Sequence, residues 1–388
     1  MRITETAIPG LLIIDLDVHG DNRGWFKENW QREKFTGLAP ELASFQPVQN
    51  NISFNHAGAT RGLHAEPWDK LVSVAQGKIF GAWCDLREGS DSFGEVVTHE
   101  VGPETAVFVP RGVANGFQAL EETSYCYLVN EHWSAEARYA AVNLNIVDWP
   151  LEPTEISKKD QQHPALAEVS PMPARRILVT GANGQLGRAL KRLLADAELC
   201  THTDFDITDP PERNWKQYSA IINCAAYNDV NGGENDRAAA WAVNAEAPAR
   251  LARIAAENQL TLVHVSSDYI FDGTNEVHSE EELPSPLSAY GASKAAGDTA
   301  AQTAPQHYVI RTSWVFGDGE NFMSTMRRLA KKGVEPKVIH DQRGRPTFAE
   351  DLAKGIVHLL NSDAEYGVYN LSNSGDTVGR DEIAMAVF

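Results

Sequence analysis

Apolar and polar residues follow different patterns in the two halves of the chain. Up to about Trp149 the apolar residues form short runs rich in Val, Phe, Tyr and Thr, such as "KLVSVAQGKIFGAWCDL", "TAVFVP" and "TSYCYLVNEHW", with Gly and Pro between them. Runs of this length and composition predict β-strands. Because no long amphipathic helix interrupts them, we expect an all-β barrel or sandwich in this half.

After Arg175 strand-like runs alternate with Ala-rich helical runs, and this predicts a parallel sheet with helices on both faces. The expected strands are Arg176–Thr180, Ala220–Cys224, Leu260–Ser266 and Tyr308–Thr312, and the expected helices are Leu186–Leu194, Ala238–Asn258 and Ala289–Ala304. Between the halves, "KKDQQHPALAEVSPMPA" has three prolines and mixed polarity, which indicates a surface linker. We expect an all-β domain over residues 1–165, a linker over 166–174, and a doubly wound α/β domain of the Rossmann type over 175–388.

Composition narrows the classes of function. The 388 residues suit two domains, and 34 Lys plus Arg against 53 Asp plus Glu give a net charge of −19, which argues against nucleic-acid binding. No apolar run approaches the roughly 20 residues of a membrane span, and "MRITETAIPG" lacks the features of a signal peptide. The four cysteines form no CxxC pair. We therefore expect reduced thiols and a cytoplasmic protein.

A glycine-rich turn follows the first expected strand of the second half. In "ILVTGANGQLG", Gly181 permits a tight turn, Gly184 lets the backbone approach a pyrophosphate, and Gly187 allows close packing of strand and helix. Alone this is a weak signal for a nucleotide site.

Polar motifs at later strand ends strengthen that interpretation. "NCAAY" and "SSDYIFDG" each end an expected strand, where a doubly wound sheet places its ligand. In "YGASK", Tyr290 and Lys294 are four residues apart and share one helix face. An ammonium beside a phenol favours the ionised phenol, which suits proton transfer near neutral pH. The alternative is a surface pair without function.

Taken together, residues 175–388 resemble the extended short-chain dehydrogenase/reductases, and within them the dTDP-4-dehydrorhamnose reductase family. "GANGQLG", "DITD", "NCAAYNDV", "SSDYIFDG", "YGASK", "RTSWVFG" and "DQRGRPT" occur in that family's order. The resemblance implies NADP(H) or NAD(H), reduction of a sugar C4 ketone, Tyr290 as proton donor with Lys294 as its partner, and Ser267 at the developing alkoxide, where the family usually has Thr. It implies further cofactor contacts at Gly184, Gln185, Leu186, Asp206, Ile207, Ala225, Ala226 and Tyr227, and substrate contacts at Asp268, Trp314 and Arg345.

Two further expectations concern the reductase half. The family continues beyond "RDEIAMAVF", so we expect this half to be C-terminally truncated. Some relatives hold Mg²⁺ at a dimer interface, but Asp298 stands where they have Glu, so no metal ligand is assigned.

The first half contains "RGLH", which suggests a cupin in an all-β domain. A metal-binding cupin needs clustered histidines, and no HxH occurs near His64, so we expect a site without metal. "DNRGWFKE", "QNN", "RGLH", "DKLVSVAQGKIF", "VPRGVANGF" and "WPLEPTEISKKD" make residues 1–165 similar to the dTDP-4-dehydrorhamnose 3,5-epimerase family. The family resemblance implies a cupin jelly roll, and a homodimer formed through this domain.

The same resemblance implies roles for individual residues. His64 would remove the α-proton, Asp160 would orient His64, Lys70 would stabilise the enolate oxygen, and Tyr127 would return a proton from the opposite face. The residues implied at the nucleotide are Arg23, Glu28, Gln49, Asn51, Arg61 and Trp133, and Asn115 is implied at the substrate. Three positions depart from the family: Asn115 replaces His, Trp133 replaces Tyr and Arg138 replaces Glu.

The two resemblances imply consecutive reactions on one dTDP-sugar. The leading hypothesis is therefore a bifunctional enzyme of dTDP-L-rhamnose synthesis, which epimerises dTDP-4-dehydro-6-deoxy-D-glucose and then reduces the product. One alternative keeps the reductase and makes the cupin half a non-catalytic nucleotide-sugar-binding module. Another is an interaction protein without turnover.

Overall fold

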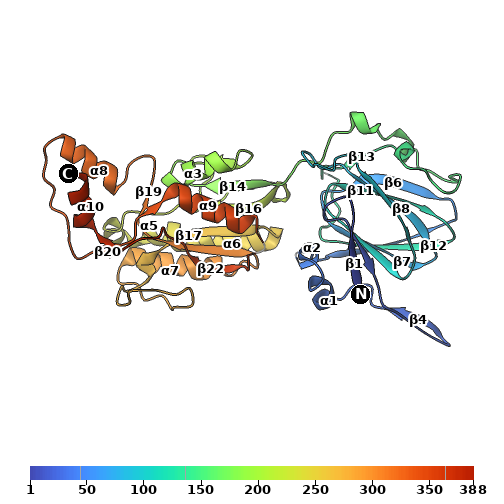
Figure 1. Cartoon of the computed structure of the whole chain (residues 1–388), viewed down its shortest axis with the longest axis horizontal. Coiled ribbons are helices and arrows are strands. Elements are labelled where there is room, and N and C mark those ends of the chain that lie inside the picture. Colours follow the sequence, from blue (N-terminus) through green and yellow to red (C-terminus); the bar gives the residue numbers. More distant parts are fainter. Residues whose placement is uncertain (44, 136, 363) are drawn as a thin grey trace. The chain divides into compact units, whose positions relative to one another are not determined.

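The computed structural model describes residues 1–388 except 44, 136 and 363. The chain divides into two compact units, Met1–Ala174 and Arg175–Phe388 (Figure 1). None of the helices in the described ranges combines the length and apolar character needed to cross a membrane.

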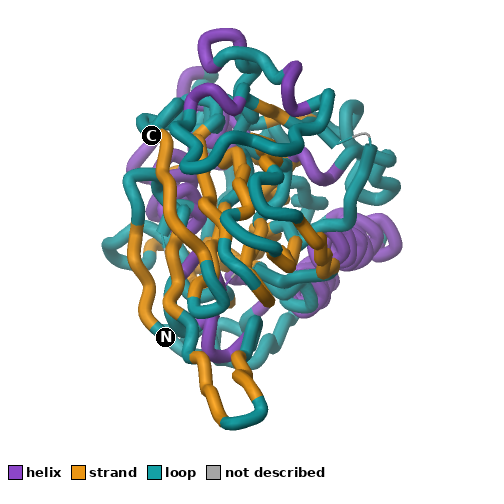
Figure 2. Tube along the Cα trace, turned by 90° about the vertical axis from the view of Figure 1, so that its right-hand side faces the viewer, coloured by secondary structure: helices purple, strands orange, loops and turns teal. Residues whose placement is uncertain are grey.

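The first unit is a sandwich of two antiparallel sheets (Figures 1 and 2). In spatial order, one sheet contains β1 (Arg2–Glu5), β2 (Leu12–Asp15), β10 (Thr105–Val109), β7 (Lys70–Gln76), β12 (Thr123–Val129) and β5 (Gln49–Asn55). The other contains β13 (Ala140–Ala141), β6 (Thr60–Ala65), β11 (Val113–Ala119), β8 (Ile79–Asp85) and β9 (Val96–Val101). The expected all-β cupin fold is confirmed.

The interior of the sandwich is filled by residues that alternate along facing strands. Val72 and Val74 of β7 and Val107 of β10 pack against Trp83 of β8 and Phe117 of β11. The short helices α1 (Arg32–Thr36) and α2 (Pro40–Ala43) cover the outer face of the first sheet, where Phe35, Leu42 and Phe45 join the core. A separate hairpin, β3 (Val18–Asp21) with β4 (Gly24–Lys27), extends from the body of this unit (Figure 2).

The segment expected as a linker packs onto the first unit instead. Val169 and Met172 are buried in its core and Leu166 packs beside them. The backbone of Met172 exchanges hydrogen bonds with Leu86 and Glu88, and the Arg111 side chain donates to the carbonyl of Pro173. The three prolines and the polar residues indicate a surface linker, but the apolar residues between them pack into the core of the sandwich.

The second unit is a six-stranded parallel sheet with helices on both faces, as expected. Its strands are β15 (Glu198–Cys200), β14 (Arg176–Thr180), β16 (Tyr218–Asn223), β17 (Thr261–Ser267), β18 (His307–Thr312) and β22 (Gly367–Asn370) in spatial order. The helices α6 (Ala247–Asn258) and α7 (Ala289–Ala301) pack on one face, and α3 (Gln185–Leu193) and α9 (Ala349–Leu360) on the other (Figure 1).

Short elements complete the second unit beyond the strand ends. The helices are α4 (Gly232–Asn235), α5 (Arg237–Trp241), α8 (Phe322–Lys331) and α10 (Arg380–Val387). The two-stranded ribbons are β19 (Val315–Phe316) with β21 (Thr347–Phe348), and β20 (Arg343–Gly344) with β23 (Val378–Gly379).

The helical run expected over Ala238–Asn258 contains a π-turn at Ala242–Glu246, which separates α5 from α6. The turn directs Asn244 toward the loop after β16, where its amide accepts from the N–H of Tyr227 and donates to the carbonyl of Tyr227. A π-turn inside a helix is commonly found at functional sites. Here it fixes the loop that carries "NCAAY".

Asp85, at the end of β8, is a buried charge that organises the next loop. Its carboxylate accepts from the guanidinium and backbone N–H of Arg87 and from the hydroxyls of Ser90 and Ser92. Burial opposes ionisation, but these hydrogen bonds outweigh it and lower the pKa of Asp85 to about 2. The carboxylate therefore stabilises the folded unit when ionised.

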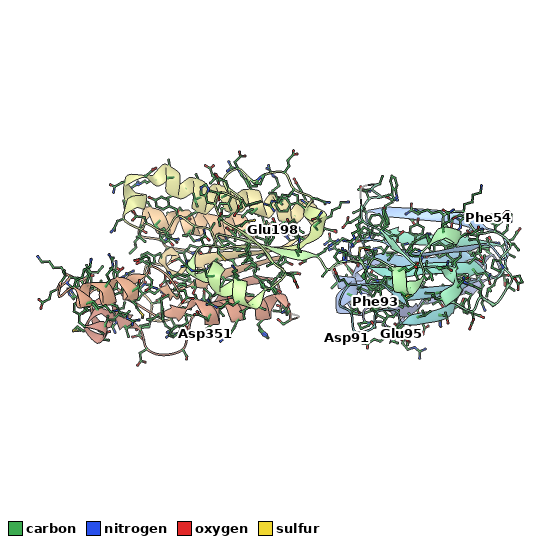
Figure 3. All side chains as sticks on the ribbon, turned by 90° about the horizontal axis from the view of Figure 1, so that it is seen from above. Phe54, Asp91, Phe93, Glu95, Glu198 and Asp351 are labelled. Carbon is green, nitrogen blue, oxygen red and sulfur yellow. The ribbon has the colours of Figure 1, made fainter. Side chains whose placement is uncertain are left out.

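We expect Asp85→Asn to lower the stability of the first unit by about 2 kcal/mol at neutral pH. A carboxyl with a depressed folded pKa stabilises above its unfolded pKa, so the difference from wild type should shrink as the pH falls from about 4 toward 2. Hydrogen exchange of peptides from β8 and β10 in urea measures this unit alone. Asp91, an exposed residue of the same loop (Figure 3), provides the control: Asp91→Asn should change little, and equal effects would contradict the assignment.

Candidate active sites

The first unit contains a cavity of about 800 Å³ bordered by strands of both sheets. Of the residues predicted for the epimerase site, seven line it: Asn51, Arg61, His64, Lys70, Asn115, Tyr127 and Asp160. They come from β5, β6, β7, β11, β12 and the 3₁₀ turn Asp160–Gln162.

His64 and Asp160 form a hydrogen-bonded pair at this cavity. The distance from His64 Nε2 to Asp160 Oδ1 is 2.9 Å, and the other carboxylate oxygen accepts from the N–H of Gly62 at 3.1 Å. Burial opposes ionisation of Asp160, but the hydrogen bonds from His64 and Gly62 lower its pKa to about 2. An ionised carboxylate thus orients the imidazole and leaves its other ring nitrogen for chemistry.

Lys70 and Tyr127 lie together on the neighbouring strands β7 and β12. Lys70 is buried, forms an ion pair with Glu66, and has its ammonium 4.8 Å from the centre of the Tyr127 ring. Burial raises the pKa of the Tyr127 phenol, and the Glu66 charge raises it further. A protonated phenol and a cation therefore border the same space as the His64–Asp160 pair.

Asn115 occupies the position where the resemblance implies His, and the structure gives it a packing role. Its side-chain oxygen accepts from the Trp83 indole N–H at 2.9 Å, and its amide donates to the Tyr125 hydroxyl at 3.1 Å. The buried indole N–H of Trp83 and the buried hydroxyl of Tyr125 are thus both satisfied by this one side chain. Asn115 is therefore coupled to the core as well as exposed to the cavity.

Four predicted nucleotide residues do not line the cavity. Arg23 forms an ion pair with Asp21 on the β3–β4 hairpin, and Glu28 forms one with Lys34. Trp133 is 67% exposed, and Gln49 donates to the side chain of Asn51 rather than facing the space. These four are not brought to the His64 site within one chain.

His163 is a neighbour of this site that sequence reasoning missed. Its ring packs edge-on against His64, with centroids 5.1 Å apart, and its Nε2 lies 3.8 Å from Asp160 Oδ1. Burial lowers the pKa of His163, which keeps the ring neutral near pH 7. Its only sequence signal is the spacing of three residues from Asp160, which a 3₁₀ turn converts into proximity.

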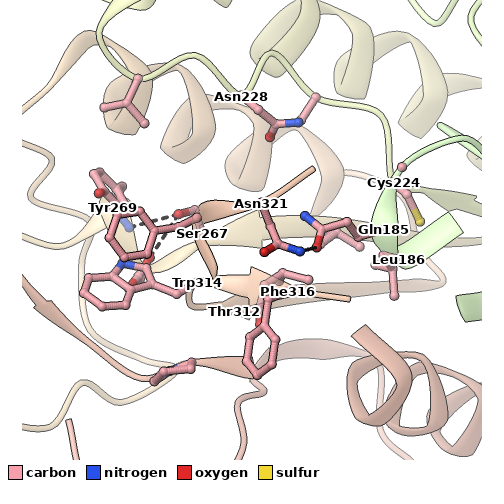
Figure 4. A pocket seen from close by; sticks show the side chains of 18 of the residues that line it. Gln185, Leu186, Cys224, Asn228, Ser267, Tyr269, Thr312, Trp314, Phe316 and Asn321 are labelled. Atoms are coloured by element: carbon pink, nitrogen blue, oxygen red, sulfur yellow. Dashed lines mark hydrogen bonds between the residues drawn. The ribbon is translucent and has the colours of Figure 1, made fainter. Parts of the chain in front are cut away.

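The second unit contains a cavity of about 490 Å³ at the carboxyl ends of its parallel strands (Figure 4). Ten of the predicted reductase residues line it: Gly184, Gln185, Leu186, Gly187, Ala226, Ser267, Asp268, Tyr290, Lys294 and Trp314. Gly184 and Gln185, where the glycine turn leads into α3, are part of this lining. Gly181 has a φ of +68°, and a Cβ there would lie 2.7 Å from the N of Ala225, so only glycine fits this turn.

Tyr290 and Lys294 lie on one buried face of α7, as their spacing predicted. The electrostatic expectation was wrong, however: burial raises the pKa of Tyr290 to about 12 and lowers that of Lys294 to about 8. Lys294 Nζ donates to the carbonyl of Val265 at 2.7 Å. Burial is the main cause, and the Asp268 charge raises the pKa of Tyr290 further, so the phenol is held protonated, as a proton donor requires.

The hydroxyl-rich end of β17 positions Ser267 and Asp268. Ser267 Oγ donates to the Asp268 carboxylate at 3.1 Å and accepts from the backbone N–H of Tyr269 (Figure 4). Asp268 in turn accepts from Ser313 Oγ at 2.7 Å, while burial raises its pKa. Ser267 and Asp268 line the cavity together with Tyr290, and Ser313 supports Asp268 from behind this lining.

Six predicted reductase residues lie outside the lining of this cavity. They are Gly181, Asp206, Ile207, Ala225, Tyr227 and Arg345. Ile207 packs into the core, Asp206 accepts from Thr208, and Tyr227 is held by Asn244. Arg345 contributes its backbone N–H to Ser313, and its neighbour Pro346 lines the space.

Arg380 and Asn321 line the same cavity and were not predicted. The Arg380 guanidinium lies 4.8 Å from the Trp314 ring centre and 5.4 Å from that of Phe322. Asn321 donates to Gln185 Oε1 at 3.2 Å, so the start of α8 is joined to the start of α3 (Figure 4). Arg380 has no motif of its own in the sequence, and Asn321 belongs only to the two-residue piece "NF" of the reductase resemblance.

No group of metal-ligating side chains gathers around Asp298 in the described residues. The Asp298 carboxylate accepts from the Arg311 guanidinium at 3.1 Å, and burial raises its pKa. These contacts do not fit a Mg²⁺ ligand, and no step involving Mg²⁺ is derived.

These folds and cavities define a two-domain enzyme that joins a cupin to a nucleotide-binding reductase. Residues 5–168 match the family model of dTDP-4-dehydrorhamnose 3,5-epimerase, and residues 175–388 match that of the RmlD substrate binding domain. The chain belongs to both families, one in each unit.

Individual relatives agree with this division. The first unit is similar to "Protein RmlC homolog" of Streptococcus pyogenes serotype M6, with 50% identity over 42% of this chain and 89% of the relative. The second is similar to dTDP-4-dehydrorhamnose reductase of Mycobacterium tuberculosis, with 39% identity over 55% of this chain and 75% of the relative. It is also similar to the crystal structure of dTDP-4-dehydrorhamnose reductase from Bacillus anthracis in complex with NADP, with a TM-score of 0.50 and 34% identity over 56% of this chain and 81% of that one.

Gly62 offers a structural test of the His64–Asp160 pair, because its N–H holds Asp160 in place. Its φ is +114°, and an added Cβ would lie 2.5 Å from the Cα of Gly116. We expect Gly62→Ala to destabilise the first unit by about 3 kcal/mol or more, from backbone strain and overlap together. Gly89→Ala is the matched control: its φ is +72° with nothing within 4 Å, so it should cost only about 1 kcal/mol. Urea unfolding followed by hydrogen exchange of β6 measures both, and similar losses would contradict the close approach.

Proposed function

We propose that this chain catalyses two consecutive steps of dTDP-L-rhamnose synthesis. The first unit, residues 1–165, would epimerise dTDP-4-dehydro-6-deoxy-D-glucose at C3 and C5, and the second, residues 175–388, would reduce the resulting 4-ketone. The observation that carries the proposal is that each unit belongs to one of the two families and has its own cavity with the matching acid–base groups. The expected cytoplasmic location stays a prediction.

Epimerisation requires a base on one face of the sugar and an acid on the other. His64, oriented by Asp160, would take the proton from the carbon beside the ketone as that C–H bond breaks. The electron pair moves onto the carbonyl oxygen, where the Lys70 ammonium would stabilise the negative charge. The protonated Tyr127 phenol would then return a proton to the carbon from the opposite face. Asn51 and Arg61 line the same space and would hold the nucleotide.

Reduction requires a hydride and a proton. The residues at the glycine turn fit a dinucleotide, because the start of α3 faces the cavity through Gly184 and Gln185. NADP(H) is proposed, since the Bacillus anthracis relative is a complex with NADP; when bound, it supplies the hydride to C4. Ser267 would hydrogen-bond the substrate oxygen, and Tyr290 would protonate it, with its phenol kept protonated by burial. Asp268 and Trp314 would contact the sugar.

The two activities can be separated by single substitutions. We expect His64→Ala to reduce deuterium incorporation at C3 and C5 in D₂O, measured without NADPH, by about 10³-fold or more. The same variant should oxidise NADPH normally when it is given dTDP-4-dehydro-L-rhamnose. Tyr290→Phe should show the reverse: exchange at the wild-type rate, and reduction slowed by about 10²-fold or more.

Other outcomes identify the alternatives. Wild-type protein that reduces the 4-ketone but shows no exchange would make the cupin unit a binding module. Absence of NADPH oxidation by cofactor-loaded wild type would reject the reductase assignment.

We also propose that the first unit forms a homodimer. Arg23 and Glu28 lie on a hairpin outside the cavity, together with Phe26, whose side chain is 65% exposed. The edge strand β5 presents Ile52 and Phe54 to solvent at 68% and 56% exposure, and Figure 3 labels Phe54 at the surface of this unit. An edge strand with outward apolar side chains is suited to pairing with a second copy. A partner seated there would cover these side chains and bring a second hairpin to the assembly.

We expect the double variant Ile52→Lys, Phe54→Lys to be monomeric in light scattering at concentrations where wild type is dimeric, because two buried cations would be unpaired in the interface. Val277→Lys is the control, because it makes the same change from an apolar side chain to a cation at a site of the second unit that is 83% exposed. This variant should leave the dimer intact. A dimer that persists in the double variant would place the interface elsewhere.

A further inference from the structure

His163 is a buried histidine beside the first cavity, and the proposed mechanism gives it no role. Its side chain is 7% exposed, and neither ring nitrogen makes a hydrogen bond in the described part of the chain. Buried polar atoms without partners are rare in native proteins and call for an explanation. An imidazole with a free nitrogen lone pair is also the commonest protein ligand for transition metals.

His163 completes a set of three ligand atoms with His64 and Asp160. One atom from each residue lies within 4.8 Å of the others, with separations from Asp160 Oδ1 of 2.9 Å to His64 Nε2 and 3.8 Å to His163 Nε2. Zn²⁺ binds nitrogen and carboxylate oxygen at about 2.0–2.2 Å in tetrahedral geometry, which places neighbouring ligand atoms roughly 3–4 Å apart. The observed triangle approaches this size. Two imidazoles and one carboxylate also leave the fourth position open.

The surroundings of Asp160 already orient it for this purpose. Its Oδ2 is occupied by the N–H of Gly62, and its backbone N–H donates to Ser157 Oγ, so Oδ1 is directed to the two rings. Hydrogen bonds of this kind orient metal ligands in known sites. His64 is about one-third exposed and borders the cavity, which provides a path for an ion.

We propose that His64, Asp160 and His163 form a binding site for Zn²⁺ or a similar divalent transition-metal ion, and that the ion inhibits the epimerase. The inhibition rests on the proposed function of the first unit, whereas the binding does not. A cation at this position would displace the proton that His64 Nε2 now donates to Asp160 Oδ1, and would coordinate both of these atoms. The imidazole bound to the ion is a weaker base, and Asp160 no longer stabilises its protonated form.

Cobalt titration of the full chain, without an affinity tag, tests the binding directly. Co²⁺ in a tetrahedral site with nitrogen ligands has intense visible absorption bands. We expect these bands to saturate at one equivalent per chain and to be displaced by Zn²⁺. His163→Gln should weaken binding by at least about tenfold. His56→Gln removes an exposed histidine of the same unit and should leave binding unchanged.

Inhibition is measured on the same proteins by deuterium exchange at C3 and C5. Zn²⁺ should abolish exchange in wild type and His56→Gln, and at least about tenfold more Zn²⁺ should be needed in His163→Gln. NADPH oxidation with dTDP-4-dehydro-L-rhamnose serves as the control within each chain and should not respond.

Each outcome decides one part of the proposal. A cobalt spectrum that is absent, or identical in wild type and His163→Gln, overturns the site. A spectrum that requires His163 in a chain without exchange activity supports the site and rejects the epimerase function separately. If His163→Gln does not fold, X-ray absorption of the zinc-loaded wild type decides: two imidazole ligands support the site, and fewer overturn it.

Discussion

The first unit depends on the carboxylate of Asp160, which joins the segment after the last strand of this unit to strand β6. Asp160 lies 96 residues beyond His64 in sequence, yet it bonds both to that side chain and to the backbone of Gly62. The carboxylate is buried, so its charge would be costly without these donors. The same contacts that stabilise the charge also set the orientation of the imidazole. The hydrogen bonds that compensate the buried charge are therefore also those that hold the proposed base in place.

Burial raises the pKa of a tyrosine in each of the two cavities, but the neighbouring lysines have different partners. Each places a tyrosine beside a lysine and holds the phenol protonated, through desolvation of Tyr127 and Tyr290. Their lysines have different partners. Lys70 forms an ion pair with Glu66, whereas the described contacts of Lys294 include only a backbone carbonyl within hydrogen-bonding distance. Burial lowers the pKa of Lys294 to about 8. Lys70 therefore has a carboxylate partner inside the protein, while burial disfavours the charged form of Lys294.

Sequence reasoning reached the two folds and the centre of each site, because local spacing was sufficient there. Tyr290 and Lys294 share a helix face by their separation of four, and the glycine turn follows a strand whose centre, residues 177–179, is apolar. The parallel sheet then brings the ends of β14, β16 and β17 to one edge without further information. Gly184, Ala226 and Ser267, at or just after these strand ends, line one cavity for that reason.

The misses have a common physical cause. His163 and Arg380 reach their cavities through a 3₁₀ turn and the start of a late helix, and neither arrangement leaves a periodic pattern. Arg23 and Glu28 occur in a family motif, but a motif does not say whether its residues serve their own chain's cavity. The pKa of Tyr290 differs from the expectation because the spacing of four residues says nothing about desolvation, which raises this pKa to about 12.

The packing of residues 166–172 has a consequence for how the two activities are made and kept. Met172 belongs to the core of the first unit, and β14, the first strand of the second unit, begins at Arg176. Only residues 173–175 of the chain lie between these two points. A gene split at the predicted linker would deprive the sandwich of part of its core, so the permissible cut is confined to a few residues. One translation product also fixes the two sites in equal number. The balance of flux between the steps is then set by their turnover rates and not by the separate regulation of two genes.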